Sequence, residues 1–177
     1  YNDSKATNVD AARRSLLSFP GPTVLILGGR YKGGDFGELG PLLGERGRRV
    51  VAIGEAQERI AAALSAVLPV DRCATLREAV ERARAAAAPG DTVLLAPACS
   101  SFDMFRDYAH RGRAFKEEVR RLKDEAEHED DPGARTHEGK TDDGPPARRA
   151  AHPSGEAGST RAEPEVGEDG GPRTHDG

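Results

Sequence analysis

Residues 23–29 read TVLILGG, an uninterrupted apolar run that ends in two glycines. A continuous run of β-branched residues and leucine, without polar alternation, is typical of a strand that is covered on both faces of a parallel sheet. Two similar runs follow, RRVVAIG at 48–54 and DTVLLAP at 91–97, and a shorter candidate, VDRCA, lies at 70–74. We therefore expect these four segments to form one sheet.

Helical patterns separate the four runs. Residues 56–67 and 76–87 are rich in alanine, place apolar residues three and four positions apart, and in the second case follow a capping residue, Thr75. Residues 36–47 predict a weaker helix because glycine and proline interrupt it, and residues 103–125 predict a long final helix. Helices between strands require right-handed crossovers, so the fold class is α/β, with a mostly parallel sheet flanked by helices.

The composition changes after residue 125. Residues 126–177 contain one aliphatic β-branched residue, Val166, and no leucine, isoleucine, methionine or aromatic residue. Such a segment cannot bury enough apolar surface to offset its ordering entropy, so we expect a domain over 1–125 and a disordered polar tail over 126–177. The four histidines of the tail are too far apart for a compact metal site.

Charge and cysteine content exclude several classes of protein. The chain carries 26 basic and 30 acidic residues, which leaves no basic footprint for nucleic acid. No apolar run approaches the ~20 residues of a membrane span, and the polar N-terminus does not resemble a secretory signal. Cys73 and Cys99 lack CxxC spacing and are expected to be reduced thiols. We expect a cytoplasmic protein. Because the sequence begins at Tyr1 and not at methionine, we also expect it to be a fragment or a processed chain.

Ligands of open α/β sheets bind beyond the carboxyl ends of the strands, and three polar segments are expected there. The first is NDSKATN at 2–8, where Thr7 and Asp10 resemble the capping box of a following helix, so that Thr7 or Asn8 would be its cap. A cap does not account for Asp3 and Lys5. If residues 3–7 are extended, the side chains at positions 3, 5 and 7 share one face, where an acid and a lysine suit a ribose hydroxyl and an anion.

The second segment is LGGRYKGGDF at 27–36, which follows the first strand. Its glycines allow a close approach of the backbone to a ligand, and they bracket two cations, Arg30 and Lys32. The loop matches neither the phosphate loop of nucleotide hydrolases nor the GxGxxG fingerprint, so a dehydrogenase is disfavoured. An anionic ligand is the natural expectation, and a turn with solvated cations is the alternative.

The third segment is LLAPACSSFDMF at 94–105. Ser100 and Ser101 are expected at the start of the last helix, where free N–H groups and hydroxyls would suit an anion, unless they are ordinary helix caps. GxSxG is absent, which disfavours a nucleophilic serine. Together the loops suit a small dicarboxylate, but the chain offers no phosphate loop and no carboxylate cluster for Mg²⁺. It should bind an anion without catalysing a reaction by itself.

The motifs NDSKATN, GGRYKGGDF and APACSSFDMF, in this order, resemble the C-terminal domain of the D-glutamate-adding members of the Mur ligase superfamily. The resemblance spans residues 1 to about 123 and includes RDYAHRGRAFKEEV at 106–119. It implies a Rossmann-like third domain of an ATP-dependent ligase that joins D-glutamate to UDP-N-acetylmuramoyl-L-alanine through an acyl phosphate, in peptidoglycan synthesis. It also implies ATP and Mg²⁺ as cofactors, bound mainly by other domains, and we expect a monomer.

The resemblance further assigns roles to individual residues. It implies that Lys5 is catalytic and faces the reaction centre, and that Asp3 binds the ribose of ATP. The other implied residues all contact D-glutamate: Thr7, Lys32, Ser101, Phe102 and Tyr108. The alternative, favoured by the missing phosphate loop, is a non-catalytic, truncated binding module for a small dicarboxylate or a nucleotide.

Deletion of residues 126–177 should leave the melting temperature nearly unchanged, because the segment has almost no apolar surface to bury. Thermal unfolding of the full and shortened chains, followed by circular dichroism, checks this expectation. A large fall in Tm on deletion would show that the segment packs on the domain.

Overall fold

The computed structural model describes residues 1–129 of the chain. The strands are β1 (Thr23–Gly28), β2 (Gly47–Ile53), β3 (Val70–Cys73) and β4 (Thr92–Leu95). They form one sheet in the order β3-β2-β1-β4, and every pair is parallel. The sequence-based prediction of four strands in an α/β fold is therefore confirmed.

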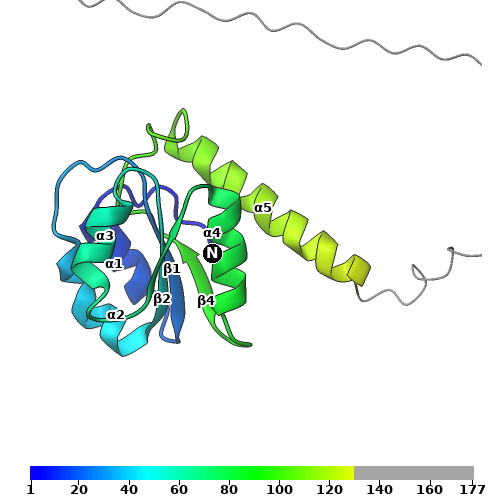
Figure 1. Ribbon diagram of the computed structural model, residues 1–177, viewed down its shortest axis with the longest axis horizontal. Helices are drawn as coiled ribbons and strands as arrows, with labels where there is room; N and C mark the ends of the chain where they lie inside the picture. Colours follow the sequence, from blue (N-terminus) through cyan, green and yellow to red (C-terminus); the bar gives the residue numbers. More distant parts are fainter. Residues whose placement is uncertain (130–177) are drawn as a thin grey trace, which may run out of the picture. The chain divides into compact units, whose positions relative to one another are not determined.

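Helices cover both faces of the sheet. Figure 1 shows α1 (Val9–Leu17), α2 (Gly40–Arg46) and α3 (Gln57–Leu64) on one face, and α4 (Leu76–Ala86) and α5 (Tyr108–Glu129) on the other. The segment that glycine and proline interrupt begins as a 3₁₀ helix, η1 (Phe36–Leu39), before α2. None of the described helices is both long and apolar enough to cross a bilayer.

The central strand β1 divides the core into two clusters. Leu25 and Leu27 pack with α1, α2 and α3, whereas Val24 and Ile26 pack with α4 and with Phe115 of α5. All six residues of β1 are buried, because successive side chains of a strand point to opposite faces and both faces are covered here. This explains why the TVLILGG stretch shows no polar alternation.

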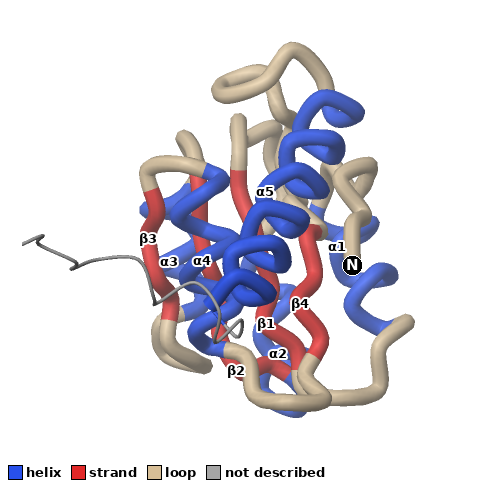
Figure 2. Tube along the Cα trace, turned by 90° about the vertical axis from the view of Figure 1, so that its right-hand side faces the viewer, coloured by secondary structure: helices blue, strands red, loops and turns tan. Residues whose placement is uncertain are grey.

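The N-terminal residues extend the sheet at the free edge of β4. The amide of Leu95 donates to the carbonyl of Tyr1 at 2.9 Å, and the amide of Asp3 donates to the carbonyl of Leu95 at 2.8 Å. Asn2 forms a parallel bridge with Leu95, and the N-terminus lies beside β4 (Figure 2). The first segment is thereby brought to the same end of the sheet as the loop after β4.

The last helix begins later than the sequence predicted. Residues 101–107 form turns in which the Ser101 carbonyl accepts from the amides of Met104 and Phe105, at 3.1 and 2.7 Å. The helix starts at Tyr108, where the Asp107 carboxylate accepts from the amide of His110 at 2.6 Å. Ser100 and Ser101 therefore do not lie at a helix N-terminus, and the expected anion site of that kind is wrong.

The same helix continues past residue 125 to Glu129. Ion pairs four residues apart, Arg121 with Glu125 and Lys123 with Glu127, support this solvated end, which has little apolar surface to pack. The composition change therefore falls within the last turns of α5. The division into two domains stays a prediction, since the expected tail from residue 130 onward lies outside the described residues.

Candidate functional site

The strand order creates a switch point beside β1. From β1 the chain proceeds to β2 and β3 on one side, while β4 lies on the other side. In open α/β sheets such a point opens a crevice at the carboxyl ends of the two strands. The β1 loop (residues 29–35) and the β4 loop (residues 96–107) leave these two ends, and the N-terminal loop (residues 2–8) lies at the adjoining edge.

Backbone hydrogen bonds join the three loops. Arg30 and Ser100 exchange two bonds, of 2.9 and 3.1 Å, which pair the β1 loop with the β4 loop. The amide of Ala98 donates to the carbonyl of Ala6 at 2.9 Å, which joins the β4 loop to the N-terminal loop. The three sequence motifs, far apart in the chain, therefore meet around the β4 loop.

A buried arginine of α5 joins the N-terminal loop and the β4 loop to the end of β1. The side chain of Arg111 is 0% exposed. Its guanidinium donates to the Ser4 hydroxyl and carbonyl at 2.9 Å each, to the Cys99 carbonyl twice at 3.2 Å, and to the Gly28 carbonyl at 3.4 Å. Desolvation lowers the pKa of Arg111 to about 10, so the group stays cationic at neutral pH.

The N-terminal loop is a turn and not an extended segment. The amide of Ala6 donates to the carbonyl of Asp3 at 3.0 Å, and the Asn2 side chain accepts from the amide of Ser4 at 3.2 Å. Asparagine side chains commonly stabilise turns in this way. The alternation expected to place Asp3, Lys5 and Thr7 on one face is therefore wrong for this segment.

Asp3 and Lys5 nevertheless lie together. Both line an open hollow of about 520 Å³ against α1, which Arg14 and Phe19 also line. They also line a second hollow, of about 300 Å³ against α5, whose remaining lining residues are Asn2, Ser4, Tyr108, Ala109, Gly112, Arg113 and Lys116. The structure thus groups Asp3, Lys5 and Tyr108, and brings the cations Arg113 and Lys116 to the same place.

Thr7, Lys32 and Ser101 line neither of these two hollows. Thr7 is half-buried and lies between Ala6, which bonds to the β4 loop, and α1. The N-cap of α1 is Asn8, whose side chain accepts from the amide of Ala11 at 2.8 Å. Of the two caps that the sequence allowed, Thr7 or Asn8, the structure has Asn8. The Thr7 hydroxyl is not the cap of α1.

Lys32 is exposed near the β4 loop, and Ser101 is 2% exposed within it. Burial raises the pKa of the Cys99 thiol to about 12, and the charges of Arg111 and Lys32 act in the opposite direction. Lys32 is thus close enough to Cys99 to influence its ionisation. Phe102 and Tyr108 are 66% and 46% exposed, so their rings are accessible from solvent.

The β1 loop is held in shape by an aromatic residue beside Lys32. The Tyr31 hydroxyl donates to the carbonyl of Gly34 at 2.9 Å, and its ring lies 5.8 Å from that of Phe36. The guanidinium of Arg59, from α3, lies 4.9 Å from the Tyr31 ring centroid, which is the geometry of a cation–π contact. Arg59 is a cation near this loop that the sequence motifs did not indicate.

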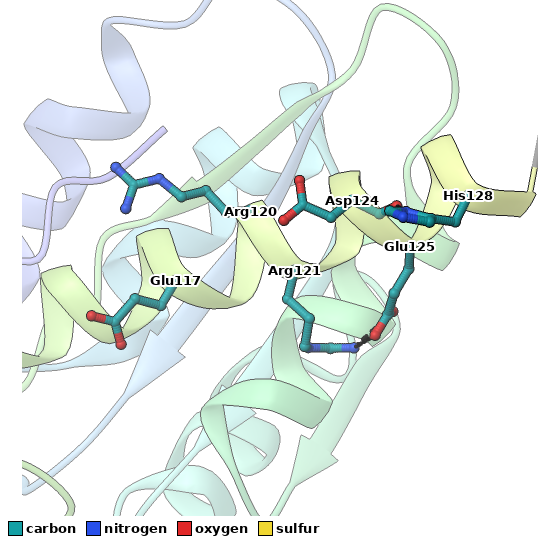
Figure 3. A pocket seen from close by; sticks show the side chains of 6 residues that line it. All are labelled: Glu117, Arg120, Arg121, Asp124, Glu125 and His128. Carbon is teal, nitrogen blue, oxygen red and sulfur yellow. Dashed lines mark hydrogen bonds and ion pairs between the residues drawn. The ribbon is translucent and has the colours of Figure 1, made fainter.

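One cluster of charged side chains lies away from the loops. An open hollow of about 650 Å³ on α5 is lined by Glu117, Arg120, Arg121, Asp124, Glu125 and His128 (Figure 3). Arg121 forms ion pairs with Glu118 and Glu125 of the same helix and with Glu81 of α4. The Arg121 cluster is a surface network that joins two helices.

Within residues 1–129, no three His, Cys, Asp or Glu residues are grouped to hold a metal ion.

Sequence reasoning missed Arg111 and Ser4 as a pair. The one signal was Gly112, beside Arg111 in the HRGR stretch of a predicted helix. A Cβ at Gly112 would lie 3.3 Å from both Asn2 and Ser4, so glycine permits the close approach of the N-terminal loop to α5. A glycine in a helix indicates such an approach but does not identify the partner.

The strand order and the meeting of the three loops are those of an open α/β sheet with a switch point beside β1, and comparison with known sequences identifies the family. Residues 1–99 match the profile described as "Mur ligase, glutamate ligase domain". The match covers more than half of the chain, so the chain belongs to the Mur ligase family.

Several relatives within that family carry the same name. The UDP-N-acetylmuramoylalanine–D-glutamate ligase of Chlorobaculum parvum is 53% identical over 121 residues, which cover 68% of this chain and 26% of the relative. The enzyme of the same name from Acidobacterium capsulatum is 53% identical over 119 residues, with 67% and 26% covered. That of Solibacter usitatus is 51% identical over 122 residues, with 69% and 28% covered. The chain therefore spans about a quarter of the length of these relatives.

Substitution of Gly29 by alanine should destabilise the domain more than the same change at Gly33 of the same loop. Both residues have positive φ, +128° and +103°, but a Cβ at Gly29 would lie 2.2 Å from the Ser100 carbonyl oxygen, whereas Gly33 has open space around it. Backbone strain alone costs about 1–3 kcal/mol, and Gly29→Ala adds a steric clash. Urea unfolding of both variants measures the difference, and equal losses would contradict the close packing of the two loops.

Proposed function

We propose that this chain is the amino-acid-binding domain of an ATP-dependent ligase that adds D-glutamate to UDP-N-acetylmuramoyl-L-alanine in peptidoglycan synthesis. The family membership and the shared name of the relatives support this proposal. The observation that carries it is the junction of the three loops, through the Arg30–Ser100 and Ala6–Ala98 backbone pairs. We also propose that the protein is cytoplasmic and monomeric.

The junction suits a small dicarboxylate. The Lys32 ammonium supplies a charge-assisted hydrogen bond for one carboxylate, and the hydroxyls of Thr7 and Ser101 supply neutral donors. The exposed rings of Phe102 and Tyr108 offer apolar contact for the methylene groups between the two carboxylates. In this assignment D-glutamate lies between the β1 loop, the β4 loop and the N-terminal loop.

The proposed reaction forms an amide through an acyl phosphate. ATP phosphorylates the terminal carboxylate of the UDP-sugar substrate and leaves as ADP. The D-glutamate amine then attacks the activated carbonyl carbon, loses a proton, and the C–O bond to phosphate breaks. Lys5 is assigned the role of a cation that stabilises the negative charge developing on the phosphate oxygens.

ATP is assigned to the neighbouring surface of the same domain. Asp3 and Lys5 line common hollows, so the carboxylate that accepts from a ribose hydroxyl lies beside the cation for the phosphates. A single aspartate in these hollows is a poor site for Mg²⁺, which prefers several oxygen ligands. The metal is therefore proposed to be held mainly by residues of other domains.

Lys32→Ala and Ser101→Ala, made in the complete ligase, should each raise the KM for D-glutamate. Loss of a hydrogen bond to a charged group costs about 1.5–3 kcal/mol, which corresponds to a rise of roughly tenfold to a hundredfold. Steady-state kinetics with D-glutamate varied measure it. Lys123→Ala, which removes a cation from the exposed part of α5, is the matched control. An unchanged KM and kcat for D-glutamate in both variants would refute the assignment.

The 177-residue chain by itself should show no ATP-dependent ligation. It spans about a quarter of its relatives and contains no phosphate-binding loop. ADP release in the presence of both substrates is the measurement, with a complete ligase as the positive control. Turnover by the isolated chain would contradict this expectation.

A further inference from the structure

We propose that Arg111 is a positioning residue for the D-glutamate site: it does not touch the amino acid, but holds the three loops in the arrangement that binds it. This inference rests on the proposed function, because it concerns the same site. It assigns a role to a residue that lies outside the three sequence motifs. Arg111 is fully buried, bonds to three segments and, within residues 1–129, forms no ion pair with an acid.

The N-terminal loop and the β4 loop each present acceptors to Arg111 close to residues proposed to bind substrate. Ser4 lies between Asp3 and Lys5, and it receives two of the hydrogen bonds. Cys99 lies two positions before Ser101 and also receives two. A planar guanidinium with five N–H donors can bind several fixed acceptors at once. A shift of Arg111 would therefore displace at least two loops together.

The third loop contacts Arg111 at the end of β1. The Gly28 carbonyl accepts from Nη1 at 3.4 Å, and the β1 loop begins at the next residue. A Cβ at Gly29 would lie 3.1 Å from Nη1, so the first residue of the loop lies close to the guanidinium. Lys32 extends from this loop. The position of the proposed cation for D-glutamate thus depends on the same buried group.

A gain in stability does not by itself explain why a buried arginine stands at position 111. Within residues 1–129, none of its hydrogen bonds goes to a carboxylate; all five go to carbonyl or hydroxyl oxygens. Well-packed apolar residues often stabilise a core as well as buried charges do. What an apolar side chain cannot do is pair with the carbonyls of three loops and add a positive charge beneath a site for a dianion.

The test compares Arg111→Met, Arg111→Lys and Ser4→Ala in the complete ligase, at a temperature well below each Tm. Loss of positioning should lower kcat/KM for D-glutamate on the order of 10- to 100-fold in Arg111→Met. Arg111→Lys, which keeps the charge but not the planar fork, should fall between wild type and Arg111→Met. Ser4→Ala removes one acceptor and should show a smaller loss. The KM for the UDP-sugar should change little in all three.

Arg121→Met is the matched control. Arg121 lies on the same helix and also makes several contacts, but these join α4 and α5 away from the loops. This variant should lose stability without a change in the D-glutamate KM. If Arg111→Met behaves like Arg121→Met, with lower Tm and unchanged D-glutamate kinetics, the positioning role is refuted. If Arg111→Met does not fold, Arg111→Lys and Ser4→Ala decide by the same criteria.

Hydrogen exchange on the 177-residue chain provides a second readout that needs no activity. In Arg111→Lys the amides of Arg30, Ala98 and Ser100, which join the loops, should exchange faster relative to those of Leu25 and Val51 in the sheet. A uniform acceleration of all amides would mean general destabilisation and would overturn the inference.

The kinetic results also separate this inference from the function on which it rests. If Lys32→Ala and Ser101→Ala alter the D-glutamate KM and Arg111→Met does not, only the role of Arg111 is wrong. If none of the three variants has an effect, the assigned site itself is wrong, and the inference falls with it.

Discussion

The arrangement of the loops depends on the hydrogen bonds that the guanidinium of Arg111 donates to them. It is fully buried, uses hydrogen bonds to three separate segments, and remains charged although burial lowers its pKa to about 10. A buried polar group must be paired, and here the partners are main-chain carbonyls and the Ser4 hydroxyl, which itself donates to the Tyr108 carbonyl at 2.8 Å. The loops and the end of β1 therefore supply the acceptors that the buried guanidinium needs, and the guanidinium supplies donors to these acceptors.

The sheet places these loops within reach of that arginine. Because β4 lies beside β1 and not beyond β3, the loops after β1 and β4 leave neighbouring strand ends. The N-terminal segment joins them by pairing with the free edge of β4 through Leu95. Unpaired edges are open to pairing with other chains, so this segment also protects the edge. The edge contact of Asn2 with Leu95 lies a few residues away, in both segments, from the Ala6–Ala98 bond of the loop junction.

Much of the fold could be predicted from local pattern. The strands follow from apolar runs such as TVLILGG, and α4 follows from helical spacing with a cap at Thr75, whose hydroxyl accepts from the amide of Glu78 at 3.1 Å. The site was less predictable. Ser101 looked like a helix start because serine favours caps, yet Asp107 caps α5. The N-terminal loop looked extended, yet Ala6 bonds back to Asp3.

The α/β class, the positions of the strands and the family motifs can be read from the sequence, because hydrophobic periodicity and short motifs are local properties of the chain. The folded chain alone shows that Ser4, Gly28 and Cys99 share one arginine, since their pairing depends on distances between residues up to 107 positions apart. The physical reason is burial. The N–H groups of Arg111 are shielded from water, so they must bond to the acceptors that lie beside them in the folded domain.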